Sequence, residues 1–277
     1  MNAAPDVRPC CLTIAGSDSG GNAGVQADLR AFHAYGLHGC TVLAALTAQT
    51  PFAVRAVRGV PPDFVAAQLE AVLDAYSIAA LKTGMLADPA VVEVVARHLA
   101  QAPDVVKIVD PVIVSTSGAR LVPDDALSAL KSSLLPLARL VTPNFPEAEA
   151  LLSLPPSPPR EATVRRSEEY ARALCGMFGA AVLVKGGHGA DEEAVDVLFD
   201  GETVQAFAAP RIRNPVSTHG TGCSLAAALT AELALGATLA DAVRGAKDYV
   251  RKAISGSYLV GPGCGVLGFV DKRRRYV

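Results

Sequence analysis

The sequence carries little net charge and few cysteines, and both shortages exclude classes of protein. Its 277 residues include 25 Lys and Arg against 27 Asp and Glu, a formal net charge of −2. Without a basic excess to neutralise phosphates, nucleic acid is not expected as a partner, and the basic run 272–275 is expected to be a solvated terminus. The six cysteines form no C-x-x-C pair, and a chain of this size needs no disulfide framework. We therefore expect reduced thiols and a cytoplasmic protein.

Long hydrophobic runs are also missing. The apolar runs stop well short of the ~18 residues that a membrane helix needs, and the N-terminus lacks the charged and apolar regions of a signal peptide. We expect no membrane partner. Hydrophobic residues nevertheless make up 51% of the chain, which is enough to form a large core and argues against disorder.

Several catalytic and binding motifs are absent. There is no P-loop, no His-Glu-x-x-His or other metal-ligand spacing, and no Gly-x-Ser-x-Gly, which weakens a hydrolase interpretation. The five histidines are scattered, so the sequence predicts no zinc site. Residues 263–268 match the glycine pattern of dinucleotide-binding turns, but no helix is expected after them, and we reject that match.

Short apolar runs alternate with segments of helical periodicity along the whole chain. Strands are predicted at 11–15, 41–46, 78–81, 105–109, 140–141 and 181–185, with a hairpin at 195–199 and 203–207. Helices are predicted at 25–36, 61–73, 88–99, 123–135 and 168–178, after Pro146, and from near Thr221 and Thr238. This alternation indicates a mainly parallel sheet with helices on both faces. With no repeat and no break, residues 1–277 are expected to form one domain, with 1–10 and 270–277 as loose termini.

Polar residues follow most of the predicted strands. They are Asp18, Gln49, Lys82-Thr83, Asp110, Asn144 with Glu147, and Lys185 through His188. In open α/β sheets, ligands bind at the carboxyl ends of the strands, so we expect these residues to converge on one edge.

The turn Gly220-Thr221-Gly222-Cys223 precedes an alanine- and leucine-rich helix. A helix N-terminus presents unpaired N–H groups and a positive dipole, which together favour an anion. The same position lowers the pKa of a thiol. A plain strand-to-helix turn with a buried cysteine fits the residues equally well.

Taken together, these residues suit phosphoryl transfer, which needs positioning, cations and a charge-neutralising metal. Asp110, Glu147 and Asn144 offer oxygen ligands for Mg²⁺, and Lys185 could reach a phosphate. Each has a simpler role open to it: Asp110 as a turn cap, Glu147 at a helix N-terminus, Lys185 as a solvated strand end.

Seven ordered segments resemble the hydroxymethylpyrimidine/phosphomethylpyrimidine kinases of thiamine biosynthesis, in the ribokinase-like superfamily. The segments are 13–18, 24–29, 46–50, 82–86, 142–148, 184–188 and 218–224, within a match from about Leu12 to Tyr258. The resemblance implies a ribokinase-like three-layer α/β/α fold, a homodimer, and ATP-dependent phosphorylation of a hydroxymethylpyrimidine and then of its monophosphate.

The resemblance also implies roles for individual residues. The pyrimidine would be bound by Gly16, Asp28, Gln49 and Met85, with the Gln49 amide as both donor and acceptor. Phosphates and Mg²⁺ would be held by Asn144, Glu147 and Lys185. The anion hole would be Gly220, Thr221, Gly222 and Cys223. Cys223 stands where most sugar kinases of the superfamily have a base, and it would either accept a proton or hold the phosphoryl group.

Two departures from the family pattern keep an alternative open. Ser19 stands where the family more often has Pro, and position 49 is Gln although some relatives carry Glu. Both features also occur in relatives that phosphorylate pyridoxal, a similar hydroxymethylated ring. A pyridoxal kinase is therefore one alternative. A catalytically silent pyrimidine-binding regulatory protein is another, because a fold alone does not settle activity. Residues 115–121 could form a flap over the site or a plain surface loop.

Overall fold

The computed structural model describes residues 8–113, 122–188 and 192–272. The 115–121 loop and the side chain of His188 lie outside the described part. In the described part the main sheet has nine strands, in the order β3-β2-β1-β4-β5-β6-β7-β8-β9. Their bounds are β1 Cys10–Asp18, β2 His38–Thr50, β3 Ala53–Gly59, β4 Ile78–Thr83, β5 Val106–Val109, β6 Leu140–Val141, β7 Ala181–Val184, β8 Glu193–Phe199 and β9 Val204–Pro210. In the order of the sheet, β2, β1, β4, β5, β6 and β7 pair in parallel. The antiparallel pairs are β3 with β2, β8 with β7 and β9 with β8.

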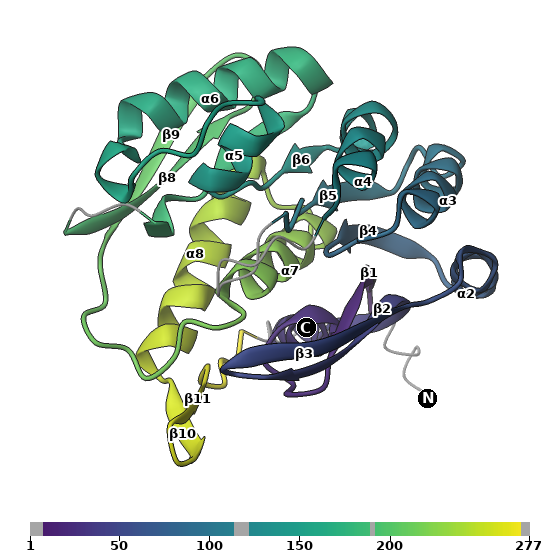
Figure 1. The fold of residues 1–277 in the computed structure, drawn as a ribbon, viewed down its shortest axis with the longest axis horizontal. Coiled ribbons are helices and arrows are strands. Elements are labelled where there is room, and N and C mark those ends of the chain that lie inside the picture. Colours follow the sequence, from purple (N-terminus) through teal and green to yellow (C-terminus); the bar gives the residue numbers. More distant parts are fainter. Residues whose placement is uncertain (1–7, 114–121, 189–191, 273–277) are drawn as a thin grey trace, which may run out of the picture.

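Helices cover both faces of this sheet (Figure 1). One core cluster joins the sheet to α2 Pro62–Ala75, α3 Pro89–Ala100, α4 Asp124–Ala129, α5 Phe145–Leu151 and α6 Val164–Phe178. The other joins it to α1 Gly24–Ala34, α7 Thr221–Ala234 and α8 Leu239–Ser255. The predicted three-layer α/β/α arrangement with a mainly parallel sheet is confirmed.

Local sequence explains where several helices begin and end. The Asp88 side chain accepts a hydrogen bond from the Ala90 N–H and caps α3, as its sequence predicts. Thr163 caps α6, which therefore starts four residues before the predicted Glu168. The predicted 123–135 helix is broken: α4 passes into a π-helical turn at Leu130–Leu134 and a 3₁₀ turn at Leu135–Leu137, where Pro136 removes a backbone donor.

Other sequence-based expectations need correction. β3 and the small hairpin of β10 (Tyr258–Gly261) with β11 (Cys264–Val266) were not predicted. The hairpin occupies the segment whose glycine pattern we rejected. At the edges of the described chain, Cys10 opens β1 and the Lys272 N–H donates to the Ala34 carbonyl, so these two residues are bonded to the fold.

The chain reverses its direction of growth across the sheet between β1 and β4. From β1 it adds β2 and β3 on one side, and then crosses to add β4 through β9 on the other. Such a switch point leaves a crevice at the carboxyl ends of the strands. Among the described residues, no helix combines the length and apolarity required to cross a bilayer.

Candidate active site

A cavity of about 700 Å³ lies at this carboxyl edge. It is large enough for two small ligands, because single-ligand pockets start near 300 Å³. Its lining includes all but one of the predicted site residues: Gly16, Gln49, Met85, Asp110, Asn144, Glu147, Lys185, Gly220, Thr221, Gly222 and Cys223. The predicted convergence of strand-end residues is therefore confirmed for those the structure describes, apart from Gly186 and the fully buried Thr83, which do not line the cavity.

The N-terminus of α7 opens into the cavity. Gly220, its N-cap residue, has φ +84°, and an added Cβ would lie 1.9 Å from the Asn22 carbonyl oxygen. Only glycine fits there, because it tolerates both the left-handed conformation and the close approach of a second backbone segment. An ideal Cβ on Gly222 would lie 3.7 Å from Lys185 Nζ, so the helix start faces a fixed cation. The start of α7 and Lys185, which follows β7, thus lie side by side where the sequence predicts an anion site.

The thiol of Cys223 lies at this helix start, but it is not poised as a thiolate. Burial raises the pKa of the thiol to about 11, against the opposing effect of the Lys82 ammonium. Asp28 and Asp110 contribute in the same direction as burial. Desolvation next to two carboxylates therefore outweighs the lowering of the pKa that a helix N-terminus gives a thiol.

Asp28 does not line the cavity, contrary to expectation. It is fully buried below the floor, where its Oδ2 lies 3.0 Å from Lys82 Nζ and accepts from Thr13 Oγ1 at 2.6 Å. Burial opposes the charge on Lys82, but Asp28 holds the pKa of the ammonium above its ordinary value. Asp28 thus acts on the site through Lys82, whose side chain does reach the cavity.

A second charged cluster surrounds Lys185 after β7. Its Nζ lies 2.7 Å from Asp110 Oδ1 and 3.7 Å from Glu147 Oε2, and all three side chains are almost entirely buried. Burial works against the ammonium, yet the two carboxylates raise the pKa of Lys185. Burial and the negative Asp110 raise the pKa of Glu147, while Lys185 opposes them.

Glu147 also has the simpler role that its sequence position allows. Glu147 and Asn144 form a capping box: Asn144 Oδ1 accepts from the Glu147 N–H at 2.9 Å, and Glu147 Oε2 accepts from the Asn144 N–H at 2.8 Å. The box fixes both side chains on the cavity wall. Two carboxylates and an amide oxygen beside one cation fit Mg²⁺, which binds few protein ligands and keeps most of its waters.

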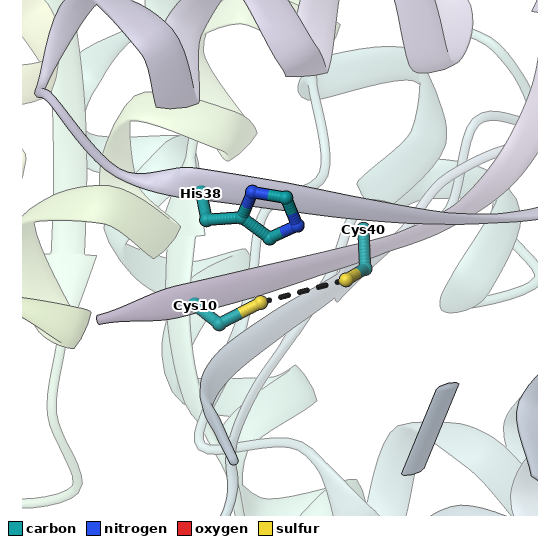
Figure 2. Close-up of side chains that lie close together, drawn as sticks. All are labelled: Cys10, His38 and Cys40. Atoms are coloured by element: carbon teal, nitrogen blue, oxygen red, sulfur yellow. Dashed lines mark hydrogen bonds between the residues drawn. The ribbon is translucent and has the colours of Figure 1, made fainter. Parts of the chain in front are cut away.

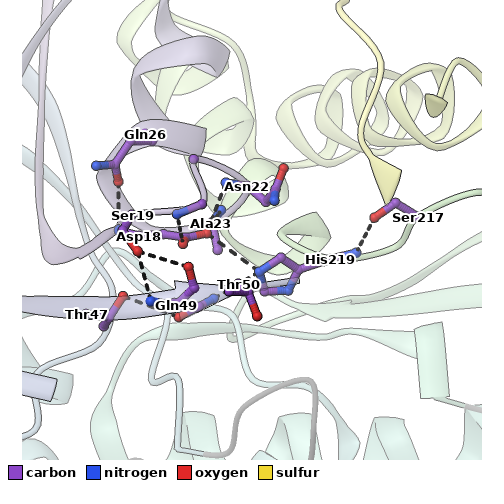
Figure 3. A network of polar contacts seen from close by, with 12 residues as sticks. Asp18, Ser19, Asn22, Ala23, Gln26, Thr47, Gln49, Thr50, Ser217 and His219 are labelled. Carbon is purple, nitrogen blue, oxygen red and sulfur yellow. Dashed lines mark hydrogen bonds and ion pairs between the residues drawn. The ribbon is translucent and has the colours of Figure 1, made fainter. Parts of the chain in front are cut away.

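The loop after β1 is held by Asp18 (Figure 3). Its Oδ1 accepts from the Gly20 N–H at 2.8 Å, and its Oδ2 accepts from the Asn22 and Ala23 N–H groups at 3.0 and 2.8 Å. Burial opposes ionisation, but His219, whose Nε2 lies 3.6 Å from Oδ2, and the hydrogen bonds from these three N–H groups lower the pKa of Asp18 to about 2. Asp18 is therefore a fixed anion that orders this loop.

Gln49 is joined to the same network (Figure 3). Its Nε2 lies 3.0 Å from His219 Nε2, and its backbone N–H and C=O both bond to Ser19 Oγ, at 2.8 and 2.9 Å. A proline at position 19 could make neither of these bonds. Ser19 and Gln49 are the two departures from the family pattern noted in the sequence, and Ser19 fixes the backbone of Gln49.

An apolar wall stands between Gln49 and β4. An added Cβ on Gly16 would lie 2.8 Å from Met85 Cε, so the absence of a side chain at 16 lets the methionine pack against β1. This wall and the Gln49 amide together suit a flat ring with one polar edge.

The opposite wall contains a cation that the sequence did not reveal. Lys247, in the middle of α8, donates to Asp196 Oδ2 at 2.6 Å and to the Ala194 carbonyl at 2.9 Å. Lys247, Asp196 and Ala194 all line the cavity. Asp18 and Lys82 were among the polar strand-end residues expected at this edge, and His219 lies in the segment 218–224, but no role was predicted for any of the three. Lys247 carried no signal at all, since its role depends on how α8 packs against β8.

Comparison with known proteins gives this arrangement a context. Residues 18–268 match the sequence profile of the phosphomethylpyrimidine kinase family. The hydroxymethylpyrimidine/phosphomethylpyrimidine kinase of Escherichia coli is 44% identical over 88% of this chain and 90% of its own. The thiamine biosynthesis bifunctional protein of Geobacter sulfurreducens is 43% identical over 96% of this chain, which spans 53% of that longer protein.

Solved structures agree in fold. Bacillus subtilis pyridoxal kinase in an ADP complex superposes with a TM-score of 0.85 at 33% identity, covering 95% of this chain and 98% of that one. The phosphomethylpyrimidine kinase of Clostridium difficile gives a TM-score of 0.78 at 34% identity, covering 89% and 100%. The ribokinase-like fold expected from the sequence is thereby confirmed.

Proposed function

Because this chain belongs to the phosphomethylpyrimidine kinase family, we propose that it is a phosphotransferase that uses ATP to phosphorylate 4-amino-5-hydroxymethyl-2-methylpyrimidine and then its monophosphate. The observation that carries this proposal is the 44% identity to the Escherichia coli kinase over nearly the full length of both chains. The site residues support it, since the anion site, the cation cluster and the polar-edged apolar wall open into one cavity. The same features argue against a silent regulatory protein.

Substrate positions follow from the two walls. The pyrimidine ring packs on Met85 beside Gly16, with its amino group and ring nitrogen toward Gln49. The nucleotide occupies the side formed by β7, β8 and α8, where Lys185 and Lys247 supply positive charge. The hydroxymethyl oxygen then faces the transferring phosphoryl group at the start of α7. Catalysis consists mainly of this alignment and of charge stabilisation, because phosphoryl transfer asks for little covalent chemistry from the protein.

The raised pKa of Cys223 supports a role in holding the phosphoryl group rather than in accepting a proton. A thiol that is protonated at neutral pH cannot accept the hydroxymethyl proton, but it can present its S–H beside the N–H groups of α7. The proton leaves the hydroxymethyl oxygen as the O–P bond forms, and it passes to a phosphate oxygen or to solvent. Lys82 and Lys185 offset the negative charge that accumulates there.

Asp110, Asn144 and Glu147 are the residues that would hold Mg²⁺. The ion supplies charge neutralisation of the nucleotide phosphates. The protein's own part is to keep the two carboxylates oriented, through Lys185 and the capping box.

A direct assay tests the proposal. The protein is incubated with ATP, Mg²⁺ and hydroxymethylpyrimidine, and mono- and diphosphate products are followed over time. We expect both products and a kcat/KM for hydroxymethylpyrimidine well above that for pyridoxal. Absence of both phosphates under conditions that phosphorylate pyridoxal would overturn the substrate assignment.

Pyridoxal kinase is the second candidate function. It is favoured by the overlap with the Bacillus subtilis enzyme and by the Ser19–Gln49 pairing. Both candidates require the same phosphoryl-transfer site, so the ratio of the two kcat/KM values decides between them.

A further inference from the structure

Two cysteines and a histidine meet at the amino edge of the sheet, away from the cavity (Figure 2). Cys10 Sγ lies 3.5 Å from Cys40 Sγ, and these sulfurs and a His38 ring nitrogen all lie within 4.8 Å of one another. Cys10 is at the start of β1, whereas Asp18 at its other end belongs to the active site. Eight residues of extended strand separate the two places by about 26 Å.

The parallel pairing of β1 with β2 brings these side chains to one face. Cys10 is opposite His38, and Leu12 is opposite Cys40. Since side chains alternate along a strand, positions 10, 38 and 40 all point to the same side of the sheet. The cluster is thus a product of strand register, and for that reason the spacing C-x₂₇-H-x-C gave no motif.

The surroundings suit a soft or borderline metal. Cys10 and Cys40 are 6% and 7% exposed, while His38 is exposed and its ring stacks on Tyr76 with centroids 5.5 Å apart. Two sulfurs on a tetrahedral zinc ion are separated by about 3.8 Å, close to the distance found here. The stacked Tyr76 limits the orientations of the imidazole, and the exposed side leaves room for a water ligand.

The register disfavours a disulfide between the same sulfurs. Two residues offset by two positions on neighbouring strands have Cα atoms about 8 Å apart, beyond the ~7 Å limit for a bridge without backbone movement.

We propose that Cys10, His38 and Cys40 bind one Zn²⁺-class divalent cation through two thiolates and one imidazole, with the fourth position open to solvent. Binding releases the two thiol protons and links β1 to β2 at the edge opposite the active site. The ion takes no part in phosphoryl transfer. This inference does not rest on the proposed function.

Cadmium titration of the reduced, chelator-treated full-length protein tests the proposal. We expect one equivalent of Cd²⁺ to produce the ultraviolet cadmium–thiolate band, and Zn²⁺ to displace it. Cys10→Ser and Cys40→Ser should lose the band, and His38→Ala should weaken binding by about tenfold or more. Zn²⁺ should raise the Tm of the parent and leave that of Cys40→Ser unchanged.

Matched variants locate the bound ion. Cys175→Ser and Cys264→Ser should titrate like the parent, since both residues lie outside the cluster. Loss of the band in Cys223→Ser instead would place the ion in the cavity and overturn the proposal. An unchanged affinity in His38→Ala, whose exposed side chain is not needed for folding, would also overturn it, as would a band that persists without both cysteines.

Discussion

Cys223 is the residue at which two physical effects oppose each other. The start of α7 favours a thiolate, while burial beside Asp28 and Asp110 favours the thiol, and the second effect prevails with a pKa of about 11. The Lys82 ammonium limits this shift but is itself paired with Asp28. A neutral thiol avoids placing a second anion against the phosphoryl group.

Replacing Cys223 tests this assignment. We expect Cys223→Ala to lower kcat by about 100-fold with little change in KM, because the interaction strengthens in the transition state. Cys223→Ser should retain more turnover than the alanine variant, since it keeps a donor at this position. Steady-state kinetics with Cys175→Ala as a control checks this, and unchanged turnover in Cys223→Ala would remove the residue from the mechanism.

Asp18 should make the stability of the protein depend on pH. Its folded-state pKa is lowered from 3.8 to about 2, so it stabilises the fold above pH 4 and this contribution is lost as pH falls from about 4 to 2. The difference corresponds to about 2 kcal/mol at neutral pH.

Asp18→Asn should therefore cost about 2 kcal/mol of unfolding free energy at pH 7, and the deficit should shrink below pH 4. Denaturant unfolding at several pH values measures this. Asp74→Asn, at an exposed position of α2, serves as the control and should change stability by less than about 0.5 kcal/mol. A deficit that stays constant with pH would show that Asp18 acts through shape alone.

At the scale of the element, α7 depends on a glycine that no side chain can replace. Gly220 and Gly236 stand before and after this helix with nearly equal φ of +84° and +83°. An added Cβ meets the Asn22 carbonyl oxygen at 1.9 Å in the first case and nothing within 4 Å in the second. A side chain at Gly236 would therefore cause only backbone strain, whereas a side chain at Gly220 would also displace the helix.

Gly236→Ala should cost about 1–2 kcal/mol of stability and leave kcat near that of the parent, because only the left-handed backbone is penalised. Gly220→Ala should add a collision that shifts α7 or the 18–24 loop, with a loss of kcat of about 100-fold. Thermal unfolding and turnover of both variants test the pair. Equal turnover in the two would contradict an anion site at the start of α7.

At the scale of the whole molecule, the cavity at the switch point between β1 and β4 has two walls. Gln49 comes from β2 on one side, and Lys247 comes from α8 on the other. Each wall is fixed by its own hydrogen bonds, the Ser19–Gln49 pair and the Lys247–Asp196 pair.

Variants on the two walls should therefore affect different substrates. Gln49→Ala should raise KM for the pyrimidine by about tenfold, and Lys247→Ala should raise KM for ATP by a similar factor, each sparing the other substrate. Two-substrate kinetics measures both constants. A raised KM for the pyrimidine in Lys247→Ala would show that the two walls do not act separately.

Local sequence determined most of the order of strands and helices and most of the residues that line the cavity. Short apolar runs predicted the buried strands, Asp88 and Thr238 predicted the starts of their helices, and the glycines near 220 predicted the start of α7. These signals could be recognised because they depend only on neighbouring residues. Strand ends then predicted a common edge, because parallel strands place their carboxyl ends together.

Tertiary structure alone decided what depends on contact between distant segments. Burial raises the pKa of Cys223, and Asp28 forms a buried ion pair with Lys82 instead of lining the cavity. The packing of α8 brings Lys247 to Asp196 on the cavity wall. The register of β1 against β2 brings Cys10, His38 and Cys40 together, although the sequence predicted no zinc site. Desolvation and strand pairing are properties of the packed molecule, so no local pattern in the sequence encodes them.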